Sequence, residues 1–441
     1  MNFPAKPLFL SIIFSWGLAG SMNDKKEKAS NDLVKKNSMI LSDHLQKNPP
    51  DTFIASLLAK YPQYFDDIVK KREDLKVQII YTSIDRKKKN KIKFTDHFYH
   101  ADSTDYFYPA STVKLPIAIL ALQRLNELKI PGLDKYSVMI TGAEGEKQTP
   151  VLNDSSSANG TASIAHYIKK ILLVSDNDAF NRLYEFLGQE YINNTLHKMG
   201  YSSAQIIHRL NIFLSEQENR YTNPVSFYDA EGKLLYAKPA EKSQFVYTSR
   251  NTKMGKGFYR GDELVNEPFD FSKKNRLSLQ DLHSIVRAVM FPESIAAAER
   301  FNLTKDDYDF LRKYMSMMPT ESVHPSYPAP GYWDTYVKFI FYGAEKNAAE
   351  PHIRIFNKPG DAYGFMIDAV YFADHKNNIE FCLSAVIYCN SDGILNDDKY
   401  DYKTVGLPFM KNLGRVIYEY ELKRQRKKTP DLGLFRFSYK D

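Results

Sequence analysis

A serine and a lysine three positions apart open a long apolar stretch of this chain. Ser111 is followed by Lys114 in the segment YPASTVK, and no other serine in the sequence has a lysine three positions later. On a helix these two positions are neighbours, one turn apart. A serine hydroxyl becomes a good nucleophile when a base takes its proton, and a lysine amine whose pKa falls on desolvation can be that base. The pair is therefore a candidate for nucleophilic catalysis.

The stretch that follows predicts a buried helix that holds this pair. Residues 115–122 (LPIAILAL) are apolar on nearly every face, and Pro116 is tolerated in a first helical turn. The free N–H groups at the start of the helix favour negative charge near Ser111. The alternative is an ordinary helix start with a capping serine and a surface lysine, an arrangement that is common in lysine-rich chains.

Two further short motifs combine hydroxyl, amide and amine groups. The segment SDN at 175–177 separates two predicted helices, and its residues are also ordinary helix caps. The segment KPG at 358–360 follows a predicted strand over 353–356. Lys198 and Lys253 also begin K-x-G segments, but only Lys358 has strand patterning on both sides. We therefore take Lys358 as the lysine of this motif.

In this order, S-x-x-K, S-D-N and K-x-G resemble the motifs of the penicillin-recognising serine hydrolases (the β-lactamase and D-alanyl-D-alanine peptidase superfamily), and most closely those of class A β-lactamases. The resemblance covers roughly 76–423, apart from 225–270. It implies an α/β protein of the α+β type, in which an antiparallel sheet is flanked by the N- and C-terminal helices and an all-helical lobe is inserted. The family's active site lies between the sheet and this lobe.

The resemblance also implies roles for the motif residues. Ser111 would be the nucleophile, Lys114 its base and Ser175 a proton relay. Asn177 would hold a substrate amide, and Lys358 would attract a substrate carboxylate.

The strand after the third motif would complete the substrate site. Gly360 and Asp361 are expected beside the bound substrate, and backbone N–H groups of Ser111 and of residues 361–363 would form the oxyanion hole. The expected substrate is a small molecule, either a β-lactam or a peptidoglycan-like amide or ester. Neither a metal nor a cofactor is expected.

Two departures from the family pattern bear on function. Pro359 replaces the hydroxyl residue in the middle of K-T-G, which removes one contact to a substrate carboxylate and one strand N–H. Leu210 and Asn211 resemble the end of the E-x-x-L-N loop pattern, but the position of its water-activating glutamate is not acidic. Glu216 and Glu218 lie nearby and are candidates for deacylation, although solvated loop charge is the commoner role of such residues.

Element patterns and composition predict the domain organisation. A sheet subdomain is expected over 51–125 and 271–441, with predicted strands at 76–85, 92–100, 333–342, 365–372 and 380–388 and helices at 52–74, 277–290, 306–318 and 408–423. Between its two parts we expect an all-helical lobe with an Ω-like loop over 126–224 and a hairpin insertion over 225–270.

The N-terminal segments predict export. Residues 1–20 combine a lysine, an apolar run and small residues, as a signal peptide does, and 21–50 is a polar, lysine-rich tether. Ser21 stands where a lipoprotein would carry its lipid-bearing cysteine, so association with a membrane is expected only if the N-terminal segment anchors the chain. The predicted location is the periplasm or cell envelope.

Composition excludes several other classes. The 441 residues are 43% hydrophobic, which argues against a disordered protein, and the net charge of +7 is spread over short runs without a basic-aromatic nucleic-acid module. The only two cysteines, Cys382 and Cys389, are predicted on opposite faces of one strand and unable to bond each other. Oligomeric state is left open.

Two function classes fit these observations. The first is an exported serine hydrolase of the class A β-lactamase type, acylated at Ser111 and slow to deacylate. The second is a non-catalytic cell-envelope binding module that retains the cleft without turnover.

Overall fold

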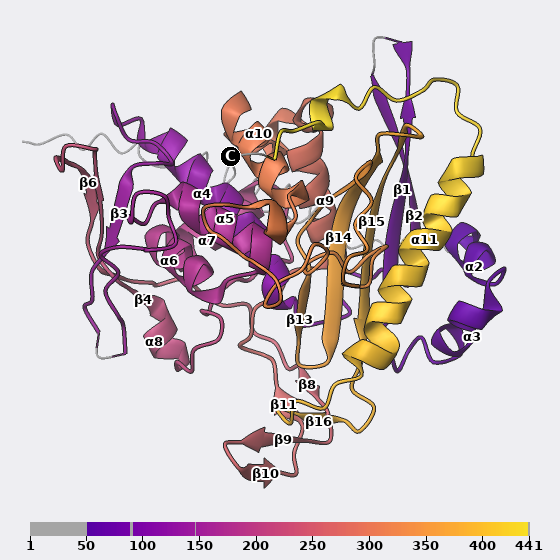
Figure 1. Cartoon of the computed structure of the whole chain (residues 1–441). Helices are drawn as coiled ribbons and strands as arrows, with labels where there is room; N and C mark the ends of the chain where they lie inside the picture. The colour runs from indigo at the N-terminus through magenta and orange to yellow at the C-terminus, as the bar shows by residue number, and fades with distance from the viewer. Residues whose placement is uncertain (1–50, 89–90, 146, 440–441) are drawn as a thin grey trace, which may run out of the picture. The chain divides into compact units, whose positions relative to one another are not determined.

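An antiparallel sheet forms the centre of the molecule (Figure 1). The computed structural model describes residues 51–88, 91–145 and 147–439, so the predicted signal peptide (1–20) and tether (21–50) lie outside the described residues. The short strand β13 (Gly360–Ala362) pairs with β14. The sheet runs in the order β12 (Ile353–Asn357), β14 (Phe365–Asp374), β15 (Ile379–Tyr388), β1 (Gln78–Arg86) and β2 (Ile92–Tyr99). The predicted fold class is confirmed.

The side chains of each strand alternate between two separate apolar cores. On β1, Ile79 and Tyr81 pack with the helices of one face, whereas Ile80 and Ile84 pack with those of the other. The first face carries α2 (Thr52–Leu58), α3 (Pro62–Lys70) and α11 (Leu407–Lys423), which come from the two ends of the described chain. The second face carries α9 (Leu279–Met290) and α10 (Lys305–Ser316) (Figure 1).

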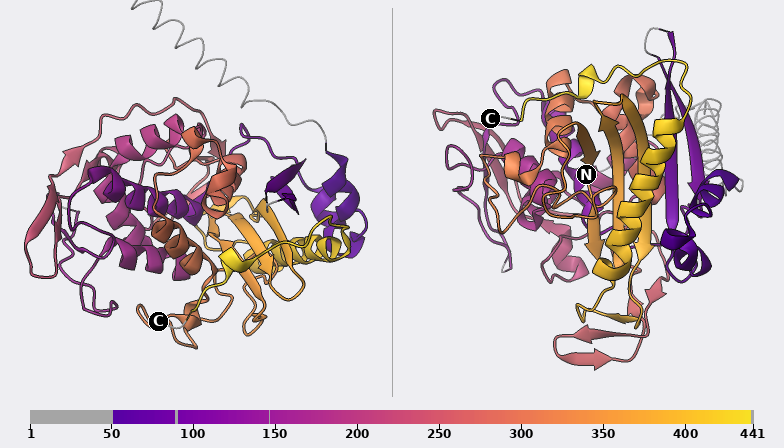
Figure 2. Two further views of the ribbon diagram at one scale, coloured as in Figure 1. Left: turned by 90° about the horizontal axis from the view of Figure 1, so that it is seen from above. Right: turned by 45° about the vertical axis from the view of Figure 1, so that its right-hand side comes forward.

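The helical lobe lies beside the second face and is built around one buried helix (Figure 2). That helix is α4 (Lys114–Leu128), whose residues are buried almost without interruption from Lys114 to Leu125. Around it pack α5 (Ile164–Val174) and α6 (Asn177–Leu187), and α7 (Gln189–Lys198) follows α6. The apolar run that predicted a central helix is therefore buried because helices surround it on several sides.

The lobe is not all helical, which corrects the prediction for 126–224. The segment β3 (Val138–Thr141) is a strand that pairs with β5 (Val225–Tyr228) of the predicted insertion. Its sequence VMIT is rich in β-formers, and four residues suffice for an edge strand but not for a helix. The short helix α8 (Glu216–Arg220) and strand β4 (Tyr221–Thr222) complete this range.

The predicted hairpin insertion is a set of short strand pairs. Asp229 and Gly232 form the turn between β5 and β6 (Leu234–Lys238). Strand β7 (Glu241–Lys242) pairs with β4. Strand β8 (Lys253–Met254) pairs with β11 (Phe269–Asp270). Strand β9 (Gly257–Arg260) pairs with β10 (Glu263–Val265) and, in parallel, with β16 (Ile394–Leu395).

Two further predictions need correction. The helix predicted over 52–74 is two helices, because Pro62 cannot continue the first and instead starts the second. The strand predicted over 333–342 is a series of turns, in which buried Lys338 donates hydrogen bonds to the carbonyl groups of Met315 at 2.7 Å and Ile355 at 2.9 Å. Within the described ranges, none of the helices is both long enough and apolar enough to cross a membrane.

Candidate active site

Ser111 lies in a tight turn immediately before the central helix. Residues Ala110–Val113 form a 3₁₀ turn that runs directly into α4 at Lys114. Ala110 has a φ of 47°, a left-handed conformation that costs energy for a residue with a Cβ and is found where the surrounding structure enforces it. Ser111 is half-buried and lines a cavity of about 630 Å³. The hydroxyl-bearing residue is thus held at the wall of an accessible cavity.

Lys114, one turn further on, is completely buried beneath this wall. Its Nζ donates hydrogen bonds to Oδ1 of Asn177 at 2.7 Å, to Oγ of Ser175 at 3.2 Å and to the carbonyl oxygen of Ser175. Burial lowers the pKa of Lys114 well below its usual value, and the nearby charge of Lys358 lowers it further. The lowered pKa favours the neutral form of the amine, which can accept a proton.

The segment SDN acts as a double helix cap, which explains its position beside Lys114. Ser175 ends α5 in a left-handed conformation with a φ of 63°, and Asp176 begins α6 by accepting a hydrogen bond from the backbone N–H of Ala179 at 2.8 Å. This sharp connection turns Ser175 and Asn177 toward α4. The structural role and the predicted functional role are therefore compatible.

Lys358 approaches Ser175 from the opposite direction. It follows β12, is fully buried, and donates from Nζ to Oγ of Ser175 at 3.0 Å and to the carbonyl oxygen of Pro359 at 2.6 Å. Burial lowers the pKa of Lys358 to about 7, although the carboxylates of Asp368 and Asp361 oppose the shift. The hydroxyl of Ser175 thus lies between two amines from distant parts of the chain.

Gly360 brings the third motif against the first. A Cβ at this position would lie 2.7 Å from the backbone nitrogen of Ser111 and 2.9 Å from that of Thr112, so the close approach requires glycine. Asp361 follows in β13 and faces the cavity, where it remains accessible to solvent. Desolvation by the cavity walls raises the pKa of its carboxyl group, while Lys358 and Lys114 oppose the rise.

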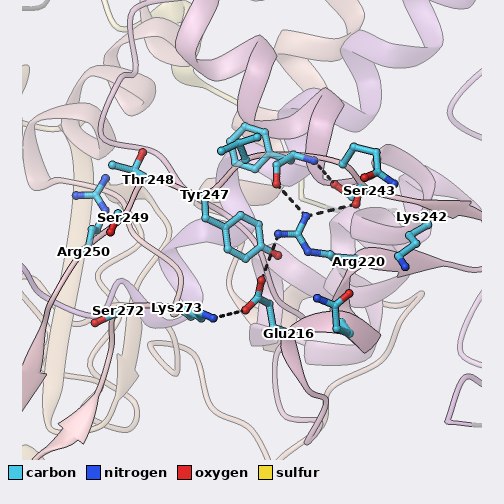
Figure 3. A pocket seen from close by; sticks show the side chains of 14 residues that line it. Glu216, Arg220, Lys242, Ser243, Tyr247, Thr248, Ser249, Arg250, Ser272 and Lys273 are labelled. Atoms are coloured by element: carbon cyan, nitrogen blue, oxygen red, sulfur yellow. Dashed lines mark hydrogen bonds and ion pairs between the residues drawn. The ribbon is translucent and has the colours of Figure 1, made fainter.

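The two candidate glutamates of the loop are occupied by structural contacts. Glu216 lines the cavity but forms ion pairs with Lys273 at 2.6 Å and Arg220 at 3.2 Å, and the hydrogen bond from Lys273 lowers its pKa. Figure 3 shows these ion pairs from a second pocket, which Glu216 also lines. Glu218 forms a capping box with Ser215 at the start of α8 and does not line the cavity. In the E-x-x-L-N pattern that ends at Asn211, the glutamate position is Ile207, whose side chain is 2% exposed.

Sequence reasoning missed two further residues that line the same cavity. His208 stacks parallel to Tyr108, and its Nδ1 lies 2.7 Å from the carbonyl oxygen of Arg209. Lys274 follows the insertion, and its ammonium group lies beside the stacked rings of Phe269 and Tyr363. Only the neighbouring L-N pattern offered a sequence signal for His208, and Lys274 had none.

The family assignment follows from the sequence as a whole. A model of the Beta-lactamase enzyme family matches residues 61–420. The chain belongs to this family. That span contains the motifs S-x-x-K, S-D-N and K-x-G and all the strands of the central sheet. No curated protein matches the sequence significantly.

Several solved structures are similar in outline. A class A β-lactamase from Clostridium kluyveri is 15% identical, with 81% of this chain and 98% of that one covered and a TM-score of 0.45. A point mutant of PBP-A, solved as an acyl-enzyme complex with penicillin G, is 14% identical, with 85% and 100% covered and a TM-score of 0.45. A β-lactamase from Sphaerobacter thermophilus is 10% identical, with 84% and 98% covered and a TM-score of 0.44. At these sequence identities and TM-scores, the likeness to solved structures adds nothing to the family assignment.

Among the described residues, no three histidine, cysteine, aspartate or glutamate side chains come together as a metal site. Both cysteines are buried and free.

Proposed function

We propose that this protein is a serine acyl-hydrolase of the β-lactamase type that is acylated at Ser111. The observation that carries the proposal is the buried amine of Lys114, which has a lowered pKa and lies one turn after a cavity-lining serine. A neutral amine can remove the hydroxyl proton as the oxygen attacks a substrate carbonyl. The contacts of Ser175 and Asn177 hold that amine in place.

The remaining motif residues support the later parts of acylation. The Ser111 Oγ–carbonyl bond forms as the carbonyl π bond breaks, and the negative oxygen is stabilised by backbone N–H groups of Ser111 and of Asp361 in β13. Collapse of this intermediate breaks the bond to the leaving nitrogen or oxygen. The proton taken by Lys114 reaches the leaving atom through the hydroxyl of Ser175, which contacts both lysines. The product is an ester on Ser111.

Deacylation is proposed to be slow. Release of the acyl group requires a water molecule activated by a base, and Ile207 stands where the E-x-x-L-N pattern carries its glutamate. Glu216 is engaged by two cations and Glu218 lies outside the cavity, which weakens both as replacements. The protein would then trap β-lactams as acyl-enzymes, and its natural substrate would be a cell-wall-like amide or ester.

Intact-mass spectrometry after incubation with benzylpenicillin tests the proposal directly. We expect one added mass equal to the intact β-lactam, absent in Ser111→Ala, and a burst near one equivalent with a chromogenic cephalosporin. An unmodified mass with folded protein would reject acylation and leave the non-catalytic binding module. Sustained turnover above about 10 per second, a median enzyme rate, would instead reject slow deacylation.

Export to the periplasm or cell envelope is part of the proposal and rests on residues 1–20 alone. Fractionation of cells that express the full chain tests it. Recovery of the protein with intact residues 1–20 in the cytoplasmic fraction would contradict it.

A further inference from the structure

The cavity that contains Ser111 extends beyond the three motifs. It is lined by Ser111, Asn177 and Asp361 and also by His208, Lys274 and Tyr363, whereas neither Lys358 nor Ser175 lines it. In the proposed reaction the leaving group must face Ser175, which returns the proton. The acyl half of the substrate then points into the remaining space, toward Lys274.

The acidic side chains that line this cavity each have cationic neighbours. Glu216 is paired with Lys273, and Asp361 is influenced by Lys358 and Lys114. The pKa of Asp270 is lowered first by the hydroxyl group of Ser272, then by the hydrogen bond from the backbone N–H of Ser272 at 2.8 Å, and also by Lys253 and Lys273. Each acid of the cavity therefore already has a cationic neighbour, although desolvation still raises the pKa of Asp361.

Lys274 differs from the other cations of the cavity. Its ammonium group forms no ion pair or hydrogen bond with a described residue, and its contacts are with the faces of Phe269 at 5.4 Å and Tyr363 at 5.8 Å. The cavity's remaining cations, Arg209 and Lys273, are bound to Glu185 and Glu216. A half-buried charge without an anionic partner carries a desolvation cost that an anionic ligand would offset.

The positive charge of Lys274 acts on His208, which also lines the cavity. Burial lowers the pKa of His208 to about 3, and the charge of Lys274 is the next cause. Because the carbonyl of Arg209 can only accept, Nδ1 of neutral His208 carries the hydrogen, and its buried Nε2 is left as an acceptor with no partner among the described residues. His208 is therefore neutral, and Lys274 supplies the positive charge beside it in the cavity wall, which suits an anionic ligand.

We propose that Lys274 forms a second anion subsite that binds a carboxylate in the acyl half of the substrate. The inference rests on the proposed function for the direction of the acyl half. It defines the substrate class as amides or esters with a carboxylate on the acyl side chain, in addition to any carboxylate that Lys358 attracts. The rings of Phe269 and Tyr363 hold the ammonium group in position.

Three penicillins that differ at one carbon provide matched probes. Benzylpenicillin is uncharged in its acyl side chain, carbenicillin carries a carboxylate there and ampicillin an ammonium group. In Ser111→Ala, which cannot be acylated, calorimetry should show carbenicillin binding about 10-fold more tightly than benzylpenicillin, the size of one charge-assisted hydrogen bond, and ampicillin more weakly than either.

Variants of adjacent lysines separate the subsite from general charge. In the same background, Lys274→Met should abolish the preference for carbenicillin and Lys274→Arg should retain it, whereas Lys256→Met, which changes an exposed lysine of the insertion outside the cavity lining, should leave it intact. An unchanged order of affinities in Lys274→Met, no preference in the parent, or no binding of any of the three would overturn the proposal. Acylation of the unmodified protein by benzylpenicillin is measured separately, so failure of the proposed function can be distinguished from failure of the proposed anion subsite.

Discussion

The backbone nitrogen of Ser111 lies so close to Gly360 that a methyl group on Gly360 would come within 2.7 Å of it. The contact joins the turn before α4 to strand β13, two segments far apart in the chain. Both partners are backbone atoms, so no flexible side chain can move aside. This relationship fixes where the third motif stands relative to the serine.

Gly360→Ala should therefore damage both stability and acylation. Overpacking of this kind costs about 1–3 kcal/mol, and displacement of β13 from Ser111 should slow acylation by about 100-fold, as the loss of an oxyanion donor does. Urea unfolding and intact-mass time courses measure the two effects. Gly331→Ala is a matched control, since the nearest atom to its new Cβ would be 3.8 Å away. Equal acylation rates in the two variants would contradict the prediction.

Lys114→Met should abolish acylation while the protein remains folded. Methionine fills similar space without a base, and loss of a general base costs at least about 100-fold in rate. Thermal unfolding checks the fold and mass spectrometry the reaction. If the variant reacts at the rate of the unmodified protein, the base lies elsewhere.

Binding of an anionic substrate should weaken as pH rises through about 7. Lys358, with a pKa of about 7, is charged below this pH and neutral above it, so its attraction for a carboxylate is lost on the alkaline side. Calorimetry of Ser111→Ala with benzylpenicillin from pH 6 to pH 9 measures the trend. Lys358→Arg keeps its charge throughout and should flatten the profile. A profile that is equally steep in this variant would assign the effect to another group.

Ile207→Glu should increase turnover of β-lactams. The substitution places a carboxylate at the glutamate position of the E-x-x-L-N pattern, beside the cavity that contains Ser111. We expect deacylation to rise by at least about 100-fold, the contribution of a positioned general base, with acylation little changed. Ile207→Gln has a similar shape without the base and serves as the control. Equal deacylation rates in both variants would refute the role of this position.

His283 should make the protein less stable in acid. Its ring nitrogens contact the hydroxyl groups of Thr82 and Ser384, each at 2.8 Å, and burial lowers its pKa from 6.5 to about 3. Above pH 6.5 both folded and unfolded states are neutral, and as pH falls toward 3 only the unfolded state gains the proton, so stability is lost at about 1.4 kcal/mol per pH unit.

The comparison with His283→Gln isolates this contribution. Asp368 opposes the trend, because burial raises the pKa of its carboxyl to about 6 and the folded state takes up that proton first. Between pH 6.5 and pH 5 the unmodified protein should therefore lose about 2 kcal/mol more than His283→Gln, as measured by urea unfolding. Parallel losses in both proteins would show that His283 is not the group responsible.

The sequence by itself determined the elements that depend on local pattern. The run after Lys114 is apolar on nearly every face, and such a helix is typically buried, so the prediction of a central helix needed no tertiary information. The alternation of β14 and β15 likewise predicted the hairpin at the centre of the sheet. The segment over 333–342 was wrongly predicted as a strand because its apolar and aromatic residues are typical of one, whereas in the folded protein it forms turns in which the buried amine of Lys338 donates to the carbonyl groups of Met315 and Ile355.

The tertiary structure alone decided how charged groups pair around the cavity. Local sequence indicates which side of an element is apolar, but an ion pair or an unpartnered charge depends on segments that meet only after folding. Glu216 is engaged by Lys273, whereas Lys274, the next residue, faces the cavity without an acid. The same holds for Ser175, whose hydroxyl lies between Lys114 and Lys358 because helix α4, the α5–α6 connection and strand β12 converge there.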